Sequence, residues 1–252
     1  MTVTILQGDC RQVLAGLPPR SVDLVLADLP YGETSLEWDR WPTGWLDAVR
    51  HVMAPHASLW VFGTLRMFVE RADEFRIAGF KLAQDVIWEK HNGTGLFNDR
   101  FRKVHEQAAQ FYPTDIPWSE IYKKPLFTND AKARTVRRKG RPAQWIGATG
   151  DTVYRSEDGG PKLMRSVMYA RSEHGRAQHP TQKPISCLLP IVEYSCRPGG
   201  LVLDPMAGSG TTALACKLLD RNCTLIEERP EYIAIAERRL SDDAPLFSGA
   251  GA

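Results

Sequence analysis

The sequence predicts an α/β protein whose sheet is doubly wound and mostly parallel. Short apolar runs alternate with longer stretches along most of the chain, as expected when helices cover both faces of such a sheet. Two of these runs, at 22–27 and 201–203, end in the motifs Asp28-Leu29-Pro30-Tyr31-Gly32 and Asp204-Pro205-Met206-Ala207-Gly208-Ser209-Gly210-Thr211-Thr212. Each motif is therefore expected to form a loop at the carboxyl end of a buried strand.

The elements can be placed in chain order from these runs. Strands are expected at 3–7, 22–27, 58–62, 82–88, 106–112, 201–204 and 222–227, and helices at 10–17, 43–53, 65–78, 184–195, 210–219 and 230–240. Ligands of open α/β sheets bind where the strand order reverses, at the carboxyl ends of the strands. If the strands before Asp28 and Asp204 are neighbours, their two loops form a site for two substrates.

Residues 113–178 interrupt the alternation and are expected to form an inserted region. The insert has 13 Lys and Arg against 7 Asp and Glu, whereas the whole chain carries a formal charge of only +2. Aromatic residues at Trp118, Tyr122 and Trp145 flank a run of cations, which is typical of a surface that binds phosphates. A solvated loop is the alternative. The run consists of Lys132, Arg134, Arg137, Arg138, Lys139 and Arg141.

Composition excludes several classes of protein. The chain of 252 residues is 43% hydrophobic and 25% charged, which is ordinary for a soluble globular protein. No leader peptide or membrane-spanning run is evident, so we expect a cytoplasmic protein with no membrane partner. The five cysteines form no C-x-x-C pair and the histidines show no ligand spacing, so we expect neither disulfides nor a metal site. Residues 241–252 are expected to be a frayed tail.

The second motif contains the pattern G-x-G-x-x-A from Gly208 to Ala213. By itself this pattern fits a dinucleotide site, a related nucleoside site or a tight turn before a helix. Glu227 follows Gly208 by nineteen residues, at the end of the next expected strand, where a carboxylate can accept hydrogen bonds from ribose hydroxyls. Glu228 is a competing candidate. The Gly-Lys-Ser/Thr of a phosphate-binding P-loop is absent from this motif.

Residues 204–212 resemble the S-adenosylmethionine loop of the amino-methyltransferases that act on DNA, and His179-Pro180-Thr181-Gln182-Lys183-Pro184 is also typical of that family. With the catalytic motif first, the order resembles the β class. The resemblance implies a Rossmann-like methyltransferase topology that is circularly permuted, with strand 3–7 continuing in space from the end of the chain. It divides the protein into a catalytic domain of 1–112 and 179–240 and a DNA target-recognition region of 113–178. The cofactor contacts that it implies are Asp9, Cys10, Lys183, Asp204, Pro205, Ala207, Gly208, Ser209, Gly210, Thr211, Thr212 and Glu227.

Asp28-Leu29-Pro30-Tyr31 resembles the Asp-Pro-Pro-Tyr motif of the same family, with Leu29 in place of the first proline. An exocyclic amine is a poor nucleophile because its lone pair is delocalised into the ring. The carboxylate of Asp28 and the carbonyl of Leu29 can each accept one of its N–H groups, and Asp28 can take the proton that is released. Pro30 fixes the turn, and Tyr31 offers a ring on which a flipped base stacks.

An aspartate in the first position is more usual for adenine, so the resemblance implies transfer of a methyl group from S-adenosylmethionine to adenine N6 in double-stranded DNA. Cytosine-N4 methylation, a DNA-binding module without turnover and a nicotinamide-dependent oxidoreductase are the alternatives. A homodimer and a partner restriction enzyme are left open. Trp88-Glu89-Lys90 and His105-Glu106 resemble positions around the catalytic face, and we expect a flexible stretch or a surface turn at Asn92-Gly93-Thr94-Gly95.

Overall fold

The structure is a computed structural model that describes residues 1–32, 37, 39–94, 98–140, 150–173, 175, 177, 179 and 182–242. The chain divides into two compact units. The larger unit comprises Met1–Lys124 and Ser166–Ala252, and the smaller one comprises Pro125–Arg165. In the part of the chain that the structure describes, no helix is both long and apolar enough to cross a membrane.

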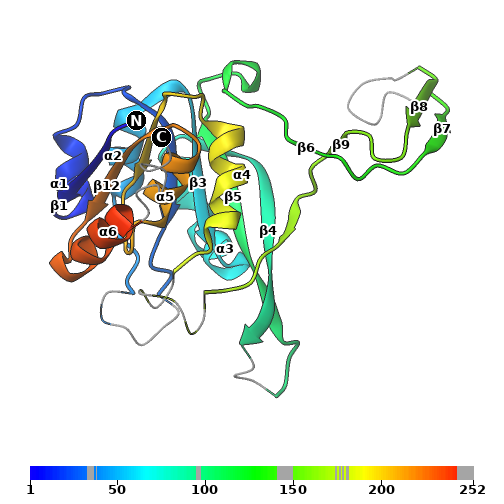
Figure 1. The fold of residues 1–252 in the computed structure, drawn as a ribbon. Helices are drawn as coiled ribbons and strands as arrows, with labels where there is room; N and C mark the ends of the chain where they lie inside the picture. Colours follow the sequence, from blue (N-terminus) through cyan, green and yellow to red (C-terminus); the bar gives the residue numbers. More distant parts are fainter. Residues whose placement is uncertain are drawn as a thin grey trace, which may run out of the picture. The chain divides into compact units, whose positions relative to one another are not determined.

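The larger unit is built on one eight-stranded sheet, which confirms the predicted α/β class with a mostly parallel sheet (Figure 1). The sixth strand in space, β5, runs antiparallel to both neighbours, and the other pairs are parallel. In spatial order the strands are β1 (Val3–Gln7), β12 (Asn222–Glu227), β11 (Leu201–Asp204), β2 (Val22–Asp28), β3 (Met53–Gly63), β5 (Lys103–Pro113), β4 (Phe80–Thr94) and β10 (Val167–Tyr169).

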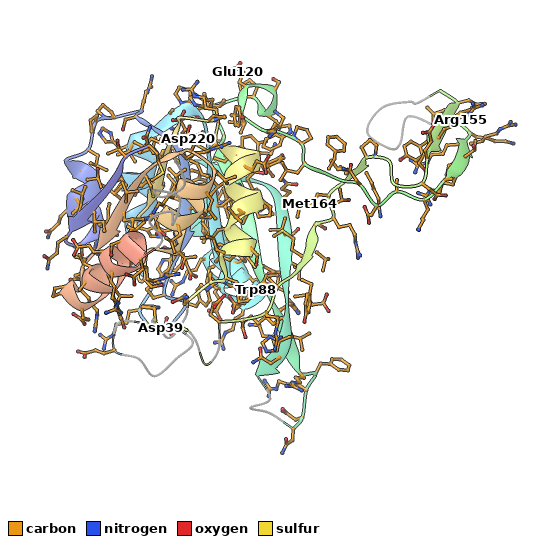
Figure 2. All side chains as sticks on the ribbon, in the orientation of Figure 1. Asp39, Trp88, Glu120, Arg155, Met164 and Asp220 are labelled. Atoms are coloured by element: carbon orange, nitrogen blue, oxygen red, sulfur yellow. The ribbon has the colours of Figure 1, made fainter. Side chains whose placement is uncertain are left out.

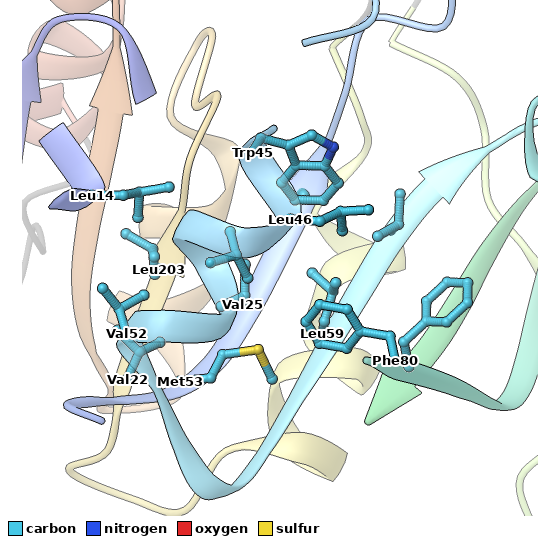
Figure 3. Packing of buried hydrophobic residues seen from close by; sticks show 14 of the residues in the cluster. Leu14, Val22, Val25, Trp45, Leu46, Val52, Met53, Leu59, Phe80 and Leu203 are labelled. Carbon is cyan, nitrogen blue, oxygen red and sulfur yellow. The ribbon is translucent and has the colours of Figure 1, made fainter. Parts of the chain in front are cut away.

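Helices cover both faces of this sheet because the central strands are apolar on both sides. On β2, Val25 and Ala27 belong to one hydrophobic cluster, and Leu24 and Leu26 belong to a second, which is the alternation expected along a strand. The first cluster joins the sheet to α1 (Cys10–Ala15), α2 (Trp45–Val52) and α3 (Leu65–Ile77), and Figure 3 shows part of it. The second joins it to α4 (Ile185–Ser195) and α5 (Thr211–Leu218), with Leu240 of α6 (Pro230–Asp242) packed against it.

The strand order reverses between β11 and β2, at the centre of the sheet. From β11 the chain passes through α5 to β12 on one side, and from β2 it passes through α2 to β3 on the other. Val25 pairs with Leu203, so Asp28 and Asp204 lie at the carboxyl ends of adjacent strands. The expectation that the two motifs are neighbours is therefore confirmed. Both motifs lie at the position where open α/β sheets bind ligands.

The β4–β5 hairpin is longer than the sequence predicts. The stretch expected to be a turn from Asn92 is still part of β4 as far as Thr94, which pairs with Lys103, and Gly95 lies outside the described residues. The turn prediction at 92–94 is therefore wrong. Interruptions of the ladder between Glu89 and Thr94 break the alternating pattern that sequence reasoning follows.

The smaller unit contains two short antiparallel ribbons. One pairs β6 (Phe127–Thr128) with β9 (Lys162–Leu163), and the other pairs β7 (Arg134–Arg138) with β8 (Thr152–Ser156), where Figure 2 labels Arg155. This unit is smaller than the expected insert of 113–178. The flanking segments belong to the larger unit, since they include the short helix η1 (Trp118–Glu120) and β10, which extends the main sheet.

Candidate active site

A cavity of about 1810 Å³ opens at the carboxyl ends of β2 and β11. Residues 28–32 line it together with residues of the glycine loop 204–212. Pockets that bind a single small molecule usually enclose about 300–1,000 Å³. The cavity is therefore large enough for two substrates, as the pair of motifs predicts.

Asp28 is the last residue of β2, and its carboxylate is bound by two side chains. Lys183 Nζ lies 2.7 Å from Oδ1 and 2.8 Å from Oδ2, and the Tyr31 hydroxyl donates to Oδ1 over 3.0 Å. The Asp28 side chain is still 26% exposed, so part of it faces the cavity. Burial raises the pKa of Asp28 above its ordinary value, and the nearby Lys183 ammonium partly offsets this effect.

Lys183 precedes α4 and joins Asp28 to a second acid, Glu106 on β5. Its Nζ lies 3.3 Å from Glu106 Oε2, and Lys90 on β4 binds Glu106 Oε1. Burial disfavours the ammonium of Lys183, but the two carboxylates outweigh burial and raise its pKa to about 12. Burial likewise opposes the charge of Glu106, yet the two lysines hold its pKa below the ordinary value. Two acids and two cations thus alternate along one side of the cavity.

The other residues of the first motif explain its departure from the family pattern. Leu29 is 3% exposed and packs in the first hydrophobic cluster, so an apolar contact holds the loop where a proline would restrict the backbone. Tyr31 packs against the same cluster, and its ring centroid lies 5.7 Å from Lys183 Nζ. Leu29, Pro30 and Tyr31 all line the cavity.

The glycine loop is held by its own carboxylate. Asp204 Oδ1 accepts a hydrogen bond from the Met206 amide over 3.1 Å, and Oδ2 accepts one from the Thr212 hydroxyl over 2.5 Å. Burial outweighs these two bonds and raises the pKa of Asp204 to about 7. Asp204 therefore fixes the shape of the loop as well as lining the cavity.

Two glycines in this loop occupy positions that a side chain would not fit. Gly210 has φ +74°, and a Cβ placed there would lie 2.8 Å from Ala236 Cβ on α6. Gly208 has φ +49°, and its Cβ would lie 3.4 Å from the ring of His179. That ring meets Tyr232 edge to face at 4.3 Å, so the aromatic pair packs beside the loop. Burial and the neighbouring Lys183 charge lower the pKa of His179 to about 4.

The predicted ribose ligand, Glu227, also contacts the loop. Its two oxygens accept hydrogen bonds from the Gly208 amide over 2.8 Å and from the Arg229 amide over 3.0 Å. Burial raises its pKa although these amides favour the ionised form. Since each carboxylate oxygen has two acceptor sites, Glu227 keeps capacity for a ligand hydroxyl. The competing candidate, Glu228, lines the same cavity.

Asp9 follows β1 and lines the cavity from the far side of β12, together with Cys10. It caps α1 by accepting from the Arg11 amide over 2.8 Å. The Arg11 side chain bonds the same carboxylate, with Nη2 2.5 Å from Oδ2, and lowers the pKa of Asp9 to about 2. Asp9 is thus a charged acceptor at the rim.

The structure brings nearly all the predicted catalytic and cofactor residues to one cavity. Gly210 is the exception among them. It faces Ala236 on α6 and does not line the cavity. Sequence reasoning did not assign a role to Glu106, Lys90 or His179, although the motifs that contain them were noted. The lining residues among those predicted are Asp9, Cys10, Asp28, Leu29, Pro30, Tyr31, Lys183, Asp204, Pro205, Ala207, Gly208, Ser209, Thr211, Thr212 and Glu227.

The predicted DNA-contacting residues lie in the smaller unit. Lys132, Arg134, Arg137, Arg138 and Lys139 are all exposed, and Arg134, Arg137 and Arg138 belong to β7. Arg141 lies outside the described residues. In the described ranges, no group of three or more His, Cys, Asp or Glu side chains is arranged to hold a metal ion.

Comparison with known proteins agrees with this architecture. The Type II methyltransferase M.HinfI of Haemophilus influenzae is 29% identical over 96% of this chain and 69% of its own length. M2.MboI of Moraxella bovis is 24% identical over 96% of this chain and 89% of its own length. Among solved structures, the M1.HpyAVI–SAM complex has a TM-score of 0.64 at 22% identity, covering 94% of this chain and 100% of that one.

The cytosine-N4-specific PvuII DNA methyltransferase superimposes with a TM-score of 0.66 at 17% identity, covering 97% of this chain and 88% of that one. At such identities these structures show the shared fold. The family model described as DNA methylase, for the N6 and N4 enzymes, matches residues 22–238. The chain is therefore a member of the N6/N4 DNA methyltransferase family.

Proposed function

We propose that this protein transfers a methyl group from S-adenosylmethionine to the N6 amine of an adenine flipped out of double-stranded DNA. The observation that carries the proposal is the position of Asp28, partly exposed in a large cavity directly beside the glycine loop. The M1.HpyAVI structure and a putative DNA modification methylase from Thermus thermophilus were solved as complexes with S-adenosylmethionine, which supports the choice of methyl donor.

The glycine-loop half of the cavity fits this donor. Gly208 lines the cavity without a side chain to occupy it, and the carboxylates of Asp9 and Glu227 offer acceptors for the hydroxyl and amine hydrogens of an adenosine. Residues 204–212 supply the remaining contacts. When bound, the donor supplies a methyl group on a sulfonium, so no metal ion is required for the transfer.

Asp28 and Leu29 act on the target amine. One N–H donates to the Asp28 carboxylate and the other to the Leu29 carbonyl, which withdraws the nitrogen lone pair from the ring and directs it towards the methyl group. A nitrogen–carbon bond forms as the carbon–sulfur bond breaks, and the methylated amine becomes cationic. Asp28 accepts the surplus proton, directly or through water.

Lys183 and Glu106 prepare Asp28 for this step. A carboxylate taken out of water tends to become neutral, and a neutral Asp28 would be a poorer acceptor. The Lys183 ammonium 2.7 Å away stabilises the anion, and Glu106 holds Lys183 from its other side. A role for Lys183 at the methionine carboxylate requires it to exchange one of these partners.

The choice of adenine rests on the aspartate at position 28, which the resemblance associates with adenine rather than cytosine. Cytosine-N4 is the second candidate, because the PvuII enzyme of this fold is cytosine-N4-specific. Incubation of DNA with the protein and labelled S-adenosylmethionine, followed by digestion to nucleosides and mass spectrometry, distinguishes N6-methyladenine from N4-methylcytosine. Label in neither product would contradict the proposal.

We assign DNA recognition to the smaller unit, through the ribbon of β7 and β8 and the lysines on either side of β7. The described cations at 132–139 are exposed, and each phosphate that a protein neutralises adds about 0.9 to the slope of log affinity against log salt. Arg137→Ala should therefore reduce this slope by about 1. Sequencing that detects modified bases in DNA from expressing cells would supply the recognition sequence.

We also propose that the fold is a circular permutation and that the protein can form a homodimer. The permutation is supported by β1, which pairs with β12 and contacts the last helix, α6. The dimer rests on the family resemblance, and sedimentation of the purified protein would test it.

A further inference from the structure

The β4–β5 hairpin leaves the main sheet as a two-stranded arm. Pairing of β5 with β3 ends at Gln107, and pairing of β10 with β4 ends at Glu89. In the described residues beyond this point β4 and β5 pair with each other as far as Thr94 and Lys103, and Ser172 donates hydrogen bonds to the side chains of His91 and Asn92 on β4. In Figure 1, β4 extends past the ends of its neighbours in the larger unit, and Figure 2 labels Trp88 near the base of this extension.

This arm borders the active-site cavity. Asn92 and Gly93 on β4 and Lys103 and His105 on β5 are among the lining residues. Gly93 lets the two strands approach closely, because a Cβ there would lie 2.5 Å from the Lys103 carbonyl oxygen. Residues of the arm therefore form part of the wall of the active-site cavity.

Phe101, near the end of the arm, is fully exposed. Its relative exposure of 101% is the highest among the large apolar side chains that the structure describes, and it is the single member of that exposed group that also lines the cavity. Scattered exposed apolar residues need no explanation. An exposed phenylalanine at the mouth of a polar site is a different case, because water hydrates it poorly and a stacking partner would cover it.

The surroundings of Phe101 favour a nucleic acid as that partner. Residues 91–94 and 98–103 include three cations, Arg100, Arg102 and Lys103, and one acid. The acid, Asp99, is paired with Arg100 over 2.7 Å, so a phosphate would have to replace it there. Cations on both sides of an aromatic ring match the phosphates and base faces of a DNA strand. Aromatic residues and cations also occur together at lipid surfaces, but Phe101 lines the cavity in which the proposed target base is methylated, and this position favours DNA.

We propose that the β4–β5 arm enters the DNA at the target site and that Phe101 fills the space in the base stack left by the flipped base. This inference rests on the function proposed above. Flipping breaks the stacking and pairing of the target nucleotide, and apolar side chains inserted between bases replace part of that stacking. Phe101 would thereby favour the extruded state without contacting the reacting atoms.

The test compares Phe101→Ala with Phe101→Trp and with a control, Ile77→Ala, which removes another exposed apolar side chain at the end of α3, where neither it nor its chain neighbours line the cavity. Single-turnover methylation is measured on a duplex that carries the site found by modified-base sequencing. It is also measured on the same duplex with an abasic position opposite the target. A third duplex carries 2-aminopurine at the target position and reports flipping by fluorescence.

With Phe101→Ala, methylation of the paired duplex should fall roughly 10- to 100-fold, which is the loss of one base stack. Its fluorescence gain should fall with it, and the abasic duplex should restore the rate to within about threefold, since an unpaired target is easier to extrude. Phe101→Trp and Ile77→Ala should behave as the unaltered protein. An equal loss on both duplexes, or no loss on either, would overturn the role of Phe101. An unaltered protein that methylates neither duplex would overturn the proposed function itself.

Discussion

The loop after β2 and the loop after β11 lie at the same edge of one sheet, yet different interactions hold them. The glycine loop is fixed by its own Asp204 and Thr212 and by Glu227 on the adjacent β12. Arg239 on α6, 30 positions after Ser209, also donates hydrogen bonds to Ser209 and Thr211. The carboxylate of Asp28 is fixed by Lys183, which lies 155 positions away in sequence, and through it by Glu106. The glycine loop and Glu227, which we call the donor half of the site, are therefore held by residues close to them in sequence. The loop that contains Asp28, the chemical half, depends on charges from distant segments.

The largest effect should come from the chemical half. Asp28→Ala removes both the acceptor for the amine hydrogen and the proton acceptor, so methyl transfer should fall by about 10²–10⁴-fold or more. The donor should still bind, since the glycine loop keeps its own contacts. Calorimetry of donor binding together with a methylation assay separates the two. Unchanged activity in Asp28→Ala would contradict the role of Asp28, and no methylation by the unaltered protein would favour a DNA-binding module without turnover.

Asp204 tests whether the glycine loop also depends on a charge. Its pKa is about 7 in the folded protein against 3.8 ordinarily, so the folded state binds the proton more tightly than the unfolded state does. Stability from this group is fully present below about pH 4 and is lost as pH rises through about 7, by roughly 4 kcal/mol in total. Asp204→Asn should remove this loss. Urea unfolding at pH 5 and pH 8 measures the difference, and identical pH dependence in both proteins would contradict it.

A substitution at Gly210 tests whether donor binding depends on the shape of the same loop. Gly210→Ala combines a left-handed backbone with a Cβ 2.8 Å from Ala236, so donor affinity should fall roughly tenfold or more from the displaced loop. Gly199→Ala is the matched control, because Gly199 has φ +73° but nothing within 4 Å of its Cβ position. It should lose only the backbone preference, with no effect on donor binding. Equal donor affinity in the two variants would exclude the steric explanation.

The subtlest prediction concerns the pH profile of methylation. Transfer requires ionised Asp28, so the rate should fall as pH falls through its raised pKa. Lys183→Met removes a neighbouring cation and should move this acid limb to higher pH, whereas Glu106→Gln removes a neighbouring anion and should move it to lower pH. Tyr31 and Asp204 also face Asp28 and are unchanged in both variants.

Glu193→Gln, which removes an exposed acid paired with Lys124, is the control for net charge. Its acid limb should coincide with that of the unaltered protein. Shifts of the same sign in Lys183→Met and Glu106→Gln would show that these residues support the fold alone, and would remove the electrostatic distinction between the two loops.

The sequence predicts the local half of the site better than the distant half. The turn after each buried strand and the glycine loop follow from residues within a few positions of one another, and the strand alternation predicts that Asp28 and Asp204 are neighbours. Nothing local indicates that Lys183 binds Asp28, because that contact depends on how the segment before α4 crosses the sheet. Nothing in the sequence indicates a role for Phe101, because the ladder irregularity beyond Glu89 hides the continuation of β4 from any pattern of alternation.

The pairing of β1 with β12 has a consequence for synthesis of the protein. During synthesis β1 finds its partner only when residues 222–227 have emerged from the ribosome, because its other edge pairs with no strand in the described sheet. Contacts across such a sequence separation form late in folding. Asp9, immediately after that strand, therefore reaches its place beside the glycine loop at the end, so an interrupted nascent chain would lack a finished donor site and could not methylate DNA prematurely.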